Sequence, residues 1–208
     1  MNSEGNGRCP DMDQPRLVLA SSSPRRLAIL KAHGLDPEVF HPNWPESLAP
    51  GLSLADLPSA LEQLALDKAA EVSTRTGAEP ALVLAADTVV FADDVLGKPA
   101  DPEQARAMLA KLSGKTHQVL TAVAIINEYN DGLIQFTDQA EVSFKDYGAD
   151  EIEAYLLAEP PYDKAGAYAI QGIWRKQVAN LVGDIDTVIG LPWQRLAPML
   201  ADCGLTFS

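Results

Sequence analysis

The clearest local signals of the chain lie in residues 17–34, Leu-Val-Leu-Ala-Ser-Ser-Ser-Pro-Arg-Arg-Leu-Ala-Ile-Leu-Lys-Ala-His-Gly. The apolar run 17–20 predicts a short strand that is covered on both faces. Ser23 is placed to cap a helix, Pro24 suits the first turn of that helix because it has no N–H to satisfy, and Gly34 ends it. The stretch therefore predicts a buried strand, a serine-rich turn and a helix.

The predicted turn concentrates groups that attract an anion. It presents three serine hydroxyls, among them those of Ser21 and Ser23, together with backbone N–H groups and the positive end of a helix dipole. Arg25 and Arg26 add two positive charges, and this combination favours a phosphate chain. The plainer alternative, a capped turn with two solvated arginines, stays open on these residues alone.

Bulk composition bounds the class of protein. The 208-residue chain is long enough for one large domain or two small lobes, and its hydrophobic content of 47% supplies a full core. Residues 1–15 contain no apolar stretch, so we expect a disordered N-terminal tail and no signal peptide. No run approaches the ~18 apolar residues of a membrane span, and Cys9 and Cys203 give no disulfide framework. We therefore expect a cytoplasmic protein with no membrane partner.

The charge balance narrows the choice of ligand. The formal net charge of −13 argues against binding to a nucleic acid polymer or to anionic lipid. If so acidic a chain binds a polyanion, its few cations have to converge at one place. The candidates, each at or near the end of a predicted element, are Arg25, Arg26, Lys68, Lys98, Lys115 and Lys164.

Helical and strand patterns alternate along the rest of the chain, and two hairpins interrupt the alternation. Because of the hairpins, we expect an α/β fold with a mixed twisted sheet flanked by helices on both sides, and not a purely doubly wound sheet. Helices are predicted at 56–75, 101–112, 150–158 and 193–204, and strands at 38–41, 81–86 running on into 87–91, 95–96, 116–126, 133–144 and 178–181.

Three ionisable residues stand out from their surroundings. Asp87 is predicted to end a strand of aliphatic residues, where a carboxylate is costly unless it has a partner or a task, such as holding Mg²⁺ or orienting a water. Lys68 falls on the apolar stripe of the helix at 56–75, which indicates either a snorkelling side chain or a lysine directed into a cleft. Glu46 follows a predicted strand. A structural turn residue and a solvated loop acid are the alternatives for Asp87 and Glu46.

Several familiar sites are excluded. The run 113–116, Ser-Gly-Lys-Thr, ends like a phosphate-binding loop, but Leu109 stands where that loop needs a glycine, and the run follows a helix where the motif needs a strand. The three histidines show no metal-binding spacing, and there is no nucleophile elbow.

Taken in order, the short motifs along the chain resemble those of one family, the Maf nucleoside triphosphate pyrophosphatases. The resemblance covers about residues 16–201. The motifs are Ser-Ser-Ser-Pro-Arg-Arg at 21–26, Ala-Asp-Thr-Val-Val at 86–90, Gly-Lys-Pro at 97–99, Leu-Ser-Gly-Lys-Thr-His at 112–117, Lys-Ala-Gly-Ala-Tyr-Ala-Ile-Gln-Gly at 164–172 and Val-Ile-Gly-Leu-Pro at 188–192.

The resemblance implies a fold and an activity. The fold would be similar to that of the inosine triphosphate pyrophosphatases, a single two-lobed domain over 16–208 with a cleft between the lobes. The activity would be hydrolysis of a nucleoside triphosphate between its α and β phosphates, with a divalent cation, Mg²⁺ or Mn²⁺, as cofactor. Ala-Asp-Thr and Ile-Gln-Gly resemble the subgroup acting on dTTP and UTP, with modified pyrimidine triphosphates as further substrates. The resemblance also suggests a homodimer.

The same resemblance assigns roles to individual residues. Asp87 would be the proton acceptor, and Arg25, Thr88 and Gln171 would mark substrate choice. Glu46 and Asp87 would hold the metal. The residues expected to bind the phosphates are Ser21, Ser23, Arg25, Arg26, Lys68 and Lys98.

The chain departs from the family pattern at three places. Asn43-Trp44-Pro45 precedes Glu46 where the family usually has an Asp-x-Asp-Glu pattern. Ala169 replaces a glycine, so a positive φ at this position would be strained. Thr187 stands where asparagine is usual. We expect these changes to tune rate or specificity without removing the proposed base.

Two other functions remain as alternatives. One is the sister activity on 7-methyl-GTP, which Thr88 and Gln171 disfavour. The other is a nucleotide-binding regulator of septum formation, for which binding would matter more than turnover.

Overall fold

The computed structural model describes residues 14–46, 48, 49 and 51–208. The tail expected at 1–15 lies outside these residues except for Gln14 and Pro15, and the side chain of Gln14 donates a hydrogen bond to Thr206. The strands are β1 (Leu17–Ala20), β2 (Glu38–Phe40), β3 (Leu82–Phe91), β4 (Val95–Leu96), β5 (Thr116–Asn127), β6 (Gly132–Phe144) and β7 (Val178–Val182). The helices are α1 (Pro24–Ala32), α2 (Leu57–Ser73), α3 (Pro102–Leu112), α4 (Ala149–Ala158), α5 (Ile185–Ile189) and α6 (Trp193–Asp202), with 3₁₀ turns η1 (Ala165–Ala167) and η2 (Gly172–Gln177).

The strands form one mixed sheet, as the alternation with hairpins predicts. Its order is β2-β1-β3-β5-β6-β7, and β4 pairs with β3 off this path. β1 runs parallel to β2 and β3, whereas β3, β5, β6 and β7 pair antiparallel. The α/β fold class with a mixed sheet is therefore confirmed.

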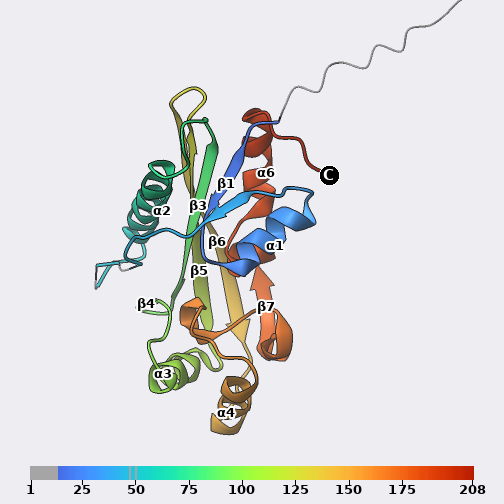
Figure 1. The fold of residues 1–208 in the computed structure, drawn as a ribbon. Helices are drawn as coiled ribbons and strands as arrows, with labels where there is room; N and C mark the ends of the chain where they lie inside the picture. Colours follow the sequence, from blue (N-terminus) through green and yellow to red (C-terminus); the bar gives the residue numbers. More distant parts are fainter. Residues whose placement is uncertain (1–13, 47, 50) are drawn as a thin grey trace, which may run out of the picture.

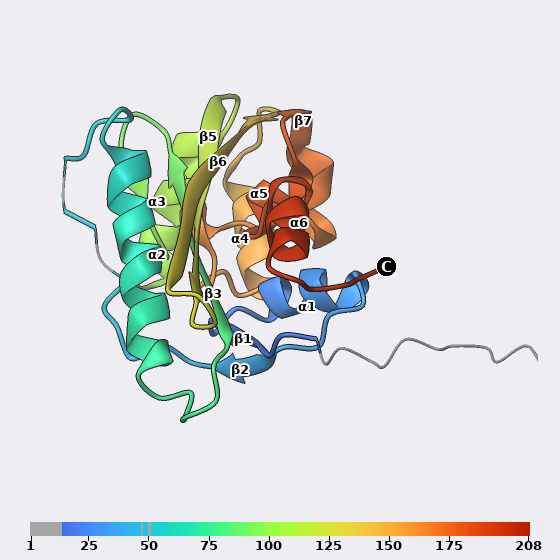
Figure 2. The same cartoon turned by 90° about the horizontal axis from the view of Figure 1, so that it is seen from above.

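Helices cover both faces of the sheet. In Figure 2, α2 lies on one face, and α1 and α6 lie on the other. The apolar face of α2 packs through Leu57 and Leu61 against β3 and β5, and α6 contributes Leu196 and Leu200 to the core on the opposite face. None of the helices in the described part of the chain combines the length and apolarity that a membrane crossing requires.

A second core lies at the other end of the long strands. It gathers residues of α3, α4 and η2, among them Leu109, Tyr155 and Trp174, around the far ends of β5 and β6. Figure 1 shows α3 and α4 at one end of the long strands, with α1, α2 and α6 grouped toward the other. β3, β5 and β6 therefore belong to both cores.

The expectation that Asp87 ends its strand is wrong. β3 continues to Phe91, because β5 keeps pairing with it from Leu82 to Phe91. What ends near Asp87 is the neighbour on the other side, because β1 pairs with β3 only as far as Ala20 opposite Ala85. Asp87 thus lies in the middle of a long strand, just past the end of its shorter neighbour.

Candidate active site

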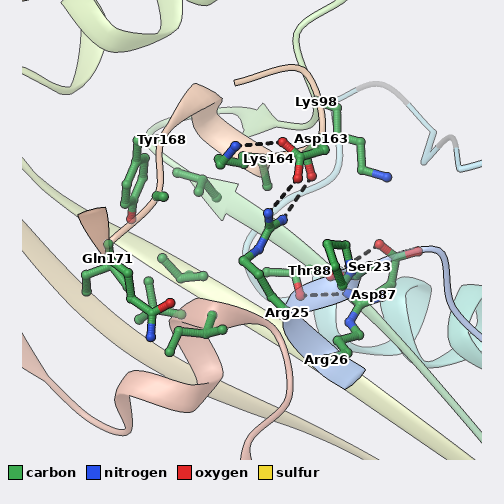
Figure 3. A pocket seen from close by; sticks show the side chains of 18 of the residues that line it. Ser23, Arg25, Arg26, Asp87, Thr88, Lys98, Asp163, Lys164, Tyr168 and Gln171 are labelled. Carbon is green, nitrogen blue, oxygen red and sulfur yellow. Dashed lines mark hydrogen bonds and ion pairs between the residues drawn. The ribbon is translucent and has the colours of Figure 1, made fainter. Parts of the chain in front are cut away.

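A cavity opens beside the N-terminus of α1, with about 830 Å³ of empty space in and above it, open solvent included. Its walls come from the turn before α1, the middle of β3, the loop at 163–171 and α5 (Figure 3). The predicted site residues that line it are Ser23, Arg25, Arg26, Glu46, Asp87, Thr88, Lys98 and Gln171.

The serine turn directs the start of α1 toward this cavity. The backbone N–H of Ser21 donates to the Phe40 carbonyl at 3.0 Å, and the Ser21 hydroxyl oxygen accepts from the N–H of Ser23 at 3.1 Å. Ser23 occupies the N-cap position of α1, as expected, but its hydroxyl makes no capping hydrogen bond in the described structure. The start of α1 therefore faces the cavity with the Ser23 hydroxyl uncommitted.

Arg26 is held by three neutral oxygens. Its Nε donates to the Gly190 carbonyl at 2.8 Å, Nη1 donates to Ser21 Oγ at 3.1 Å, and Nη2 donates to Thr88 Oγ1 at 3.1 Å. Burial lowers the pKa of Arg26, while the nearby charge of Asp87 acts in the opposite direction. A guanidinium carries five N–H donors, so two remain for a ligand after these three bonds.

The carbonyl that holds Arg26 belongs to the end of α5, which the sequence patterns did not predict. The side chain of Asp184 caps this short helix by accepting from the N–H of Asp186 at 3.0 Å. Gly190 ends it with φ of 119°. A Cβ at Gly190 would lie 3.1 Å from Thr88 Oγ1 and 3.5 Å from Arg26 Nε. Both the φ and this close approach require glycine.

Asp87 shares a lysine with Glu46. The Nζ of Lys68 donates to Asp87 Oδ2 and also to Glu46 Oε1, the latter at 3.0 Å. The other Glu46 oxygen accepts from Lys98, and Asp87 Oδ1 accepts from the backbone N–H of Thr88 at 2.9 Å. The Lys68 side chain is 3% exposed, so it is directed into the site and does not snorkel.

Electrostatics keep Glu46 ionised. Partial burial acts to raise its pKa, but the hydrogen bond from Lys98 and the charge of Lys68 outweigh burial and lower the pKa to about 2. Asp87 and Glu46 therefore face two lysines, and the Glu46 carboxylate carries its charge throughout the neutral range.

Arg25 takes part in an ion-pair cluster at the edge of the cavity. Its Nη1 lies 2.6 Å from Asp163 Oδ2, and its Nη2 donates to the Asp163 carbonyl at 3.1 Å. Lys164 Nζ lies 2.7 Å from the other carboxylate oxygen of Asp163. The Asp163 side chain is 51% exposed. Asp163 was not singled out from the sequence, although it directly precedes the motif that begins at Lys164.

The opposite end of the cavity is less charged. Figure 3 shows Gln171 and Tyr168 on one side and Lys98 and Asp87 on the other, with Arg25 between them. Aliphatic side chains such as Val119 and Ile189 also line the cavity. The hydroxyl of Tyr168 lies 2.7 Å from Nε2 of the buried His117. The cavity therefore has a charged end and a mainly apolar end that carries one amide.

Comparison with known proteins places the chain in a family. Residues 16–203 match the family described as Maf-like protein. The chain belongs to the Maf family. A protein of Caldicellulosiruptor bescii named "dTTP/UTP pyrophosphatase" is 42% identical, over 91% of this chain and 95% of the relative. Proteins with the same name from Geobacter metallireducens and Clostridium perfringens are 42% and 38% identical, over 86% and 92% of this chain and 92% and 98% of the relatives.

Not every residue predicted from the sequence for the site lines the cavity. Ser21 is 4% exposed and stands behind the wall, where it contacts Arg26. Lys68 is not among the lining residues, but its Nζ contacts Glu46 and Asp87, which are. Lys115, one of the candidate cations, lies at a separate depression together with Glu141 and Asp93. Five of the six candidate cations thus converge on the cavity or on its acids.

The structure shows where the departures from the Maf pattern lie. Of the run 43–46, only Glu46 lines the cavity, and the backbone N–H of Asn43 donates to Glu71 at 3.0 Å. Ala169 has no positive φ, and the positive φ of this loop falls on Gly166 and Ala167, at 66° and 62°. Alanine therefore causes no strain at 169.

Thr187, the third departure, is fully buried on α5. Its hydroxyl donates to Asp138 on β6, and its carbonyl accepts from Thr121 on β5 at 2.7 Å. Thr187 therefore anchors α5 to the sheet beneath Arg26.

Proposed function

We propose that this chain is a nucleoside triphosphate pyrophosphatase that hydrolyses dTTP and UTP to the monophosphate and pyrophosphate. The observation that carries the proposal is one cavity that Asp87 lines together with Arg25, Arg26 and Lys98. It is supported by relatives of about 40% identity over most of the chain, each named "dTTP/UTP pyrophosphatase".

The charged end of the cavity suits the triphosphate. Arg26 has two N–H groups left for phosphate oxygens, and the Ser23 hydroxyl and the start of α1 supply further donors. Arg25 and Lys98 are paired with carboxylates that a phosphate chain would replace. Ser21 and Lys68 contribute indirectly, by orienting Arg26 and Asp87.

The bond cleaved joins the α phosphorus to the oxygen that bridges to the β phosphate. An oxygen–phosphorus bond forms from water, the bridging bond breaks, and the charge that develops passes to the leaving pyrophosphate. Asp87 accepts the proton of the attacking water, because its carboxylate faces the cavity and is held at both oxygens, by Lys68 and by the N–H of Thr88. The cations at the charged end stabilise the leaving pyrophosphate.

The acids of the site fit a divalent cation. Within the described residues, no group of three or more His, Cys, Asp or Glu side chains gathers. However, Glu46 and Asp87 both contact the Nζ of Lys68, so their carboxylates lie close to each other. Mg²⁺ typically uses one or two carboxylates together with substrate phosphates and water. We therefore propose Glu46 and Asp87 as the protein ligands of Mg²⁺ or Mn²⁺. The bound cation would supply charge neutralisation at the phosphate oxygens.

The apolar end of the cavity suits a pyrimidine. The Gln171 amide offers a carbonyl acceptor and N–H donors. These match the edge of thymine or uracil, on which carbonyl acceptors alternate with an N–H donor. Aliphatic and aromatic lining residues contact the ring faces. Because unmatched polar groups are costly in such a site, a base with a different edge would be rejected.

A panel of nucleoside triphosphates tests this function directly. The purified chain is incubated with dTTP, UTP, the other common triphosphates and 7-methyl-GTP, with Mg²⁺ or Mn²⁺, and the products are identified. We expect dTMP or UMP together with pyrophosphate. Cleavage of 7-methyl-GTP in preference to dTTP would establish the sister activity. Tight nucleotide binding without any product would favour a nucleotide-binding regulator.

Three further properties belong to the same proposal. We propose a cytoplasmic enzyme, a homodimer, and a single two-lobed domain spanning 16–208. Cell fractionation tests the first, light scattering during size-exclusion chromatography tests the second, and limited proteolysis tests the third.

A further inference from the structure

A row of polar side chains crosses the sheet beneath the cavity. Thr88 on β3 is paired in register with Thr121 on β5, which is paired with Asp138 on β6. Thr121 is fully buried, and Thr88 lies between it and Arg26. The first two members of the row thus connect the site with the interior of the sheet.

Three hydrogen bonds link Arg26, Thr88, Thr121 and the Thr187 carbonyl in a chain. The groups at the two ends of this chain determine which atom donates in each bond. At one end, the Thr187 carbonyl can only accept, so Thr121 donates its single hydroxyl proton to it at 2.7 Å. The Thr88 and Thr121 hydroxyl oxygens lie 2.9 Å apart, and the proton between them must then come from Thr88. At the other end, Arg26 can only donate, and it does so to Thr88 at 3.1 Å.

This accounting leaves Thr88 without a proton for the substrate. Phosphate oxygens only accept hydrogen bonds, so Thr88 cannot bind them directly while its proton is committed to Thr121. Its oxygen can instead accept a hydrogen bond from the guanidinium of Arg26, and Arg26 does line the cavity.

We infer that Thr121 is a positioning residue: it commits the Thr88 hydroxyl as an acceptor and so fixes the direction in which Arg26 presents its free N–H groups to the triphosphate. The inference rests on the proposed function and extends it to a buried side chain that does not line the cavity. It also offers a way in which Thr88, expected from the family motifs to mark substrate choice, would act on the site through Arg26.

The decisive experiment is a double-mutant cycle. Thr121→Val removes the acceptor but keeps the branched shape that suits a strand, and Thr88→Val removes the next oxygen in the row. We expect Thr121→Val to lower kcat/KM for dTTP by about 10-fold, because a charged hydrogen-bonding group loses its alignment. We expect Thr121→Val to cost less than about 2-fold when it is added to Thr88→Val, because it acts through Thr88.

Two further variants separate positioning from folding. Thr121→Ser retains the hydroxyl, and we expect it to keep kcat/KM within about 2-fold of the unmodified protein. Thr116→Val is the matched control, because Thr116 lies on the same strand and its hydroxyl contacts Ser143, away from the cavity. If Thr121→Val does not fold, Thr121→Ala replaces it, since it removes the same hydroxyl without adding volume.

The possible results divide cleanly. Full activity of a folded Thr121→Val, or losses at Thr88 and Thr121 that simply add, would overturn the inference and leave the proposed function intact. If the unmodified protein releases no pyrophosphate from any triphosphate, the proposed function is wrong. The same cycle is then measured by calorimetry with dTTP: non-additive affinity losses support the inference, and additive or absent losses overturn it.

Discussion

Arg25 and Arg26 are neighbours in the chain, but they belong to different regions of the site. Arg25 is at the rim, where it pairs with the half-exposed carboxylate of Asp163. Arg26 is at the floor, where neutral oxygens of Ser21, Thr88 and Gly190 hold it. The charge of Arg25 is therefore already balanced by a carboxylate that it contacts, whereas the hydrogen bonds of Arg26 go to neutral oxygens and the nearby carboxylate of Asp87 acts on it only through its charge.

The difference indicates which interactions a ligand has to replace. A phosphate that approaches Arg25 displaces a carboxylate. The net gain in binding free energy is small, because one exposed ion pair replaces another. A phosphate that approaches Arg26 meets a fixed and buried cation, which costs no reorganisation. We therefore expect the floor to contribute most of the binding and catalysis, and the rim to adjust them.

The largest expected effect is at the acid beside the floor. Asp87→Asn keeps the shape of the side chain but removes the proton acceptor, so we expect kcat for dTTP to fall by about 1,000-fold or more. Nucleotide affinity, measured by calorimetry, should be retained. Asp93→Asn in the turn after β3 is the matched control. An Asp87→Asn variant with unchanged turnover would remove Asp87 from the mechanism.

Exchanging each arginine for lysine tests the comparison itself. Lysine keeps the charge but cannot make the three directed bonds that hold Arg26, so we expect Arg26→Lys to lower kcat/KM by about 100-fold. Arg25→Lys can still pair with Asp163, and we expect a loss of about 5-fold. Steady-state kinetics with dTTP measure both. Equal losses at the two positions would contradict the division into floor and rim.

A smaller effect, with the opposite sign, is expected at the rim. Asp163→Asn releases Arg25 and Lys164 from their carboxylate, so we expect KM for dTTP to fall by up to about 5-fold, the value of an exposed ion pair. Glu153→Gln, which breaks the exposed pair with Arg106 away from the cavity, serves as control. A raised KM in Asp163→Asn would show that Asp163 contributes to binding.

The smallest effect concerns stability and pH. The pKa of Glu46 is lowered from 4.5 to about 2 in the folded protein, so its ion pairs stabilise the fold above pH 4.5 and lose this contribution as the pH falls toward 2. We expect Glu46→Gln to melt at a lower temperature than the unmodified protein at pH 7, and this difference to shrink below pH 4.5. Circular dichroism melting curves measure it. A difference that does not change with pH would assign the effect of Glu46 to packing.

Local patterns predicted the elements well. The apolar run at 17–20 and the Pro24 start are found as β1 and α1, and the hairpins at β3–β4 and β5–β6 appear where turn residues interrupt the strand patterns. These features depend on neighbours in the sequence. For Lys68, the apolar helix stripe left two alternatives, a snorkelling side chain or one directed into a cleft, and only the packing in three dimensions decides for the second.

Features that depend on distant residues could not be predicted. The bond from Arg26 to Gly190 joins residues 164 positions apart, and the extent of β3 past Asp87 is set by the length of β5. α5 was missed because five residues give no helical period, although Asp184 before it and Gly190 after it are ordinary cap residues. The sequence could thus single out residues that line one cavity, but not which of them hold the others.

The long central strands have a consequence for how the molecule unfolds. Because β3, β5 and β6 each pass through both hydrophobic cores, neither end of the molecule can lose its structure while the other keeps a complete sheet. Heating should therefore produce one cooperative transition, the same by tryptophan fluorescence as by circular dichroism. Damage to packing around α3 and α4 should accordingly weaken the nucleotide cavity as well.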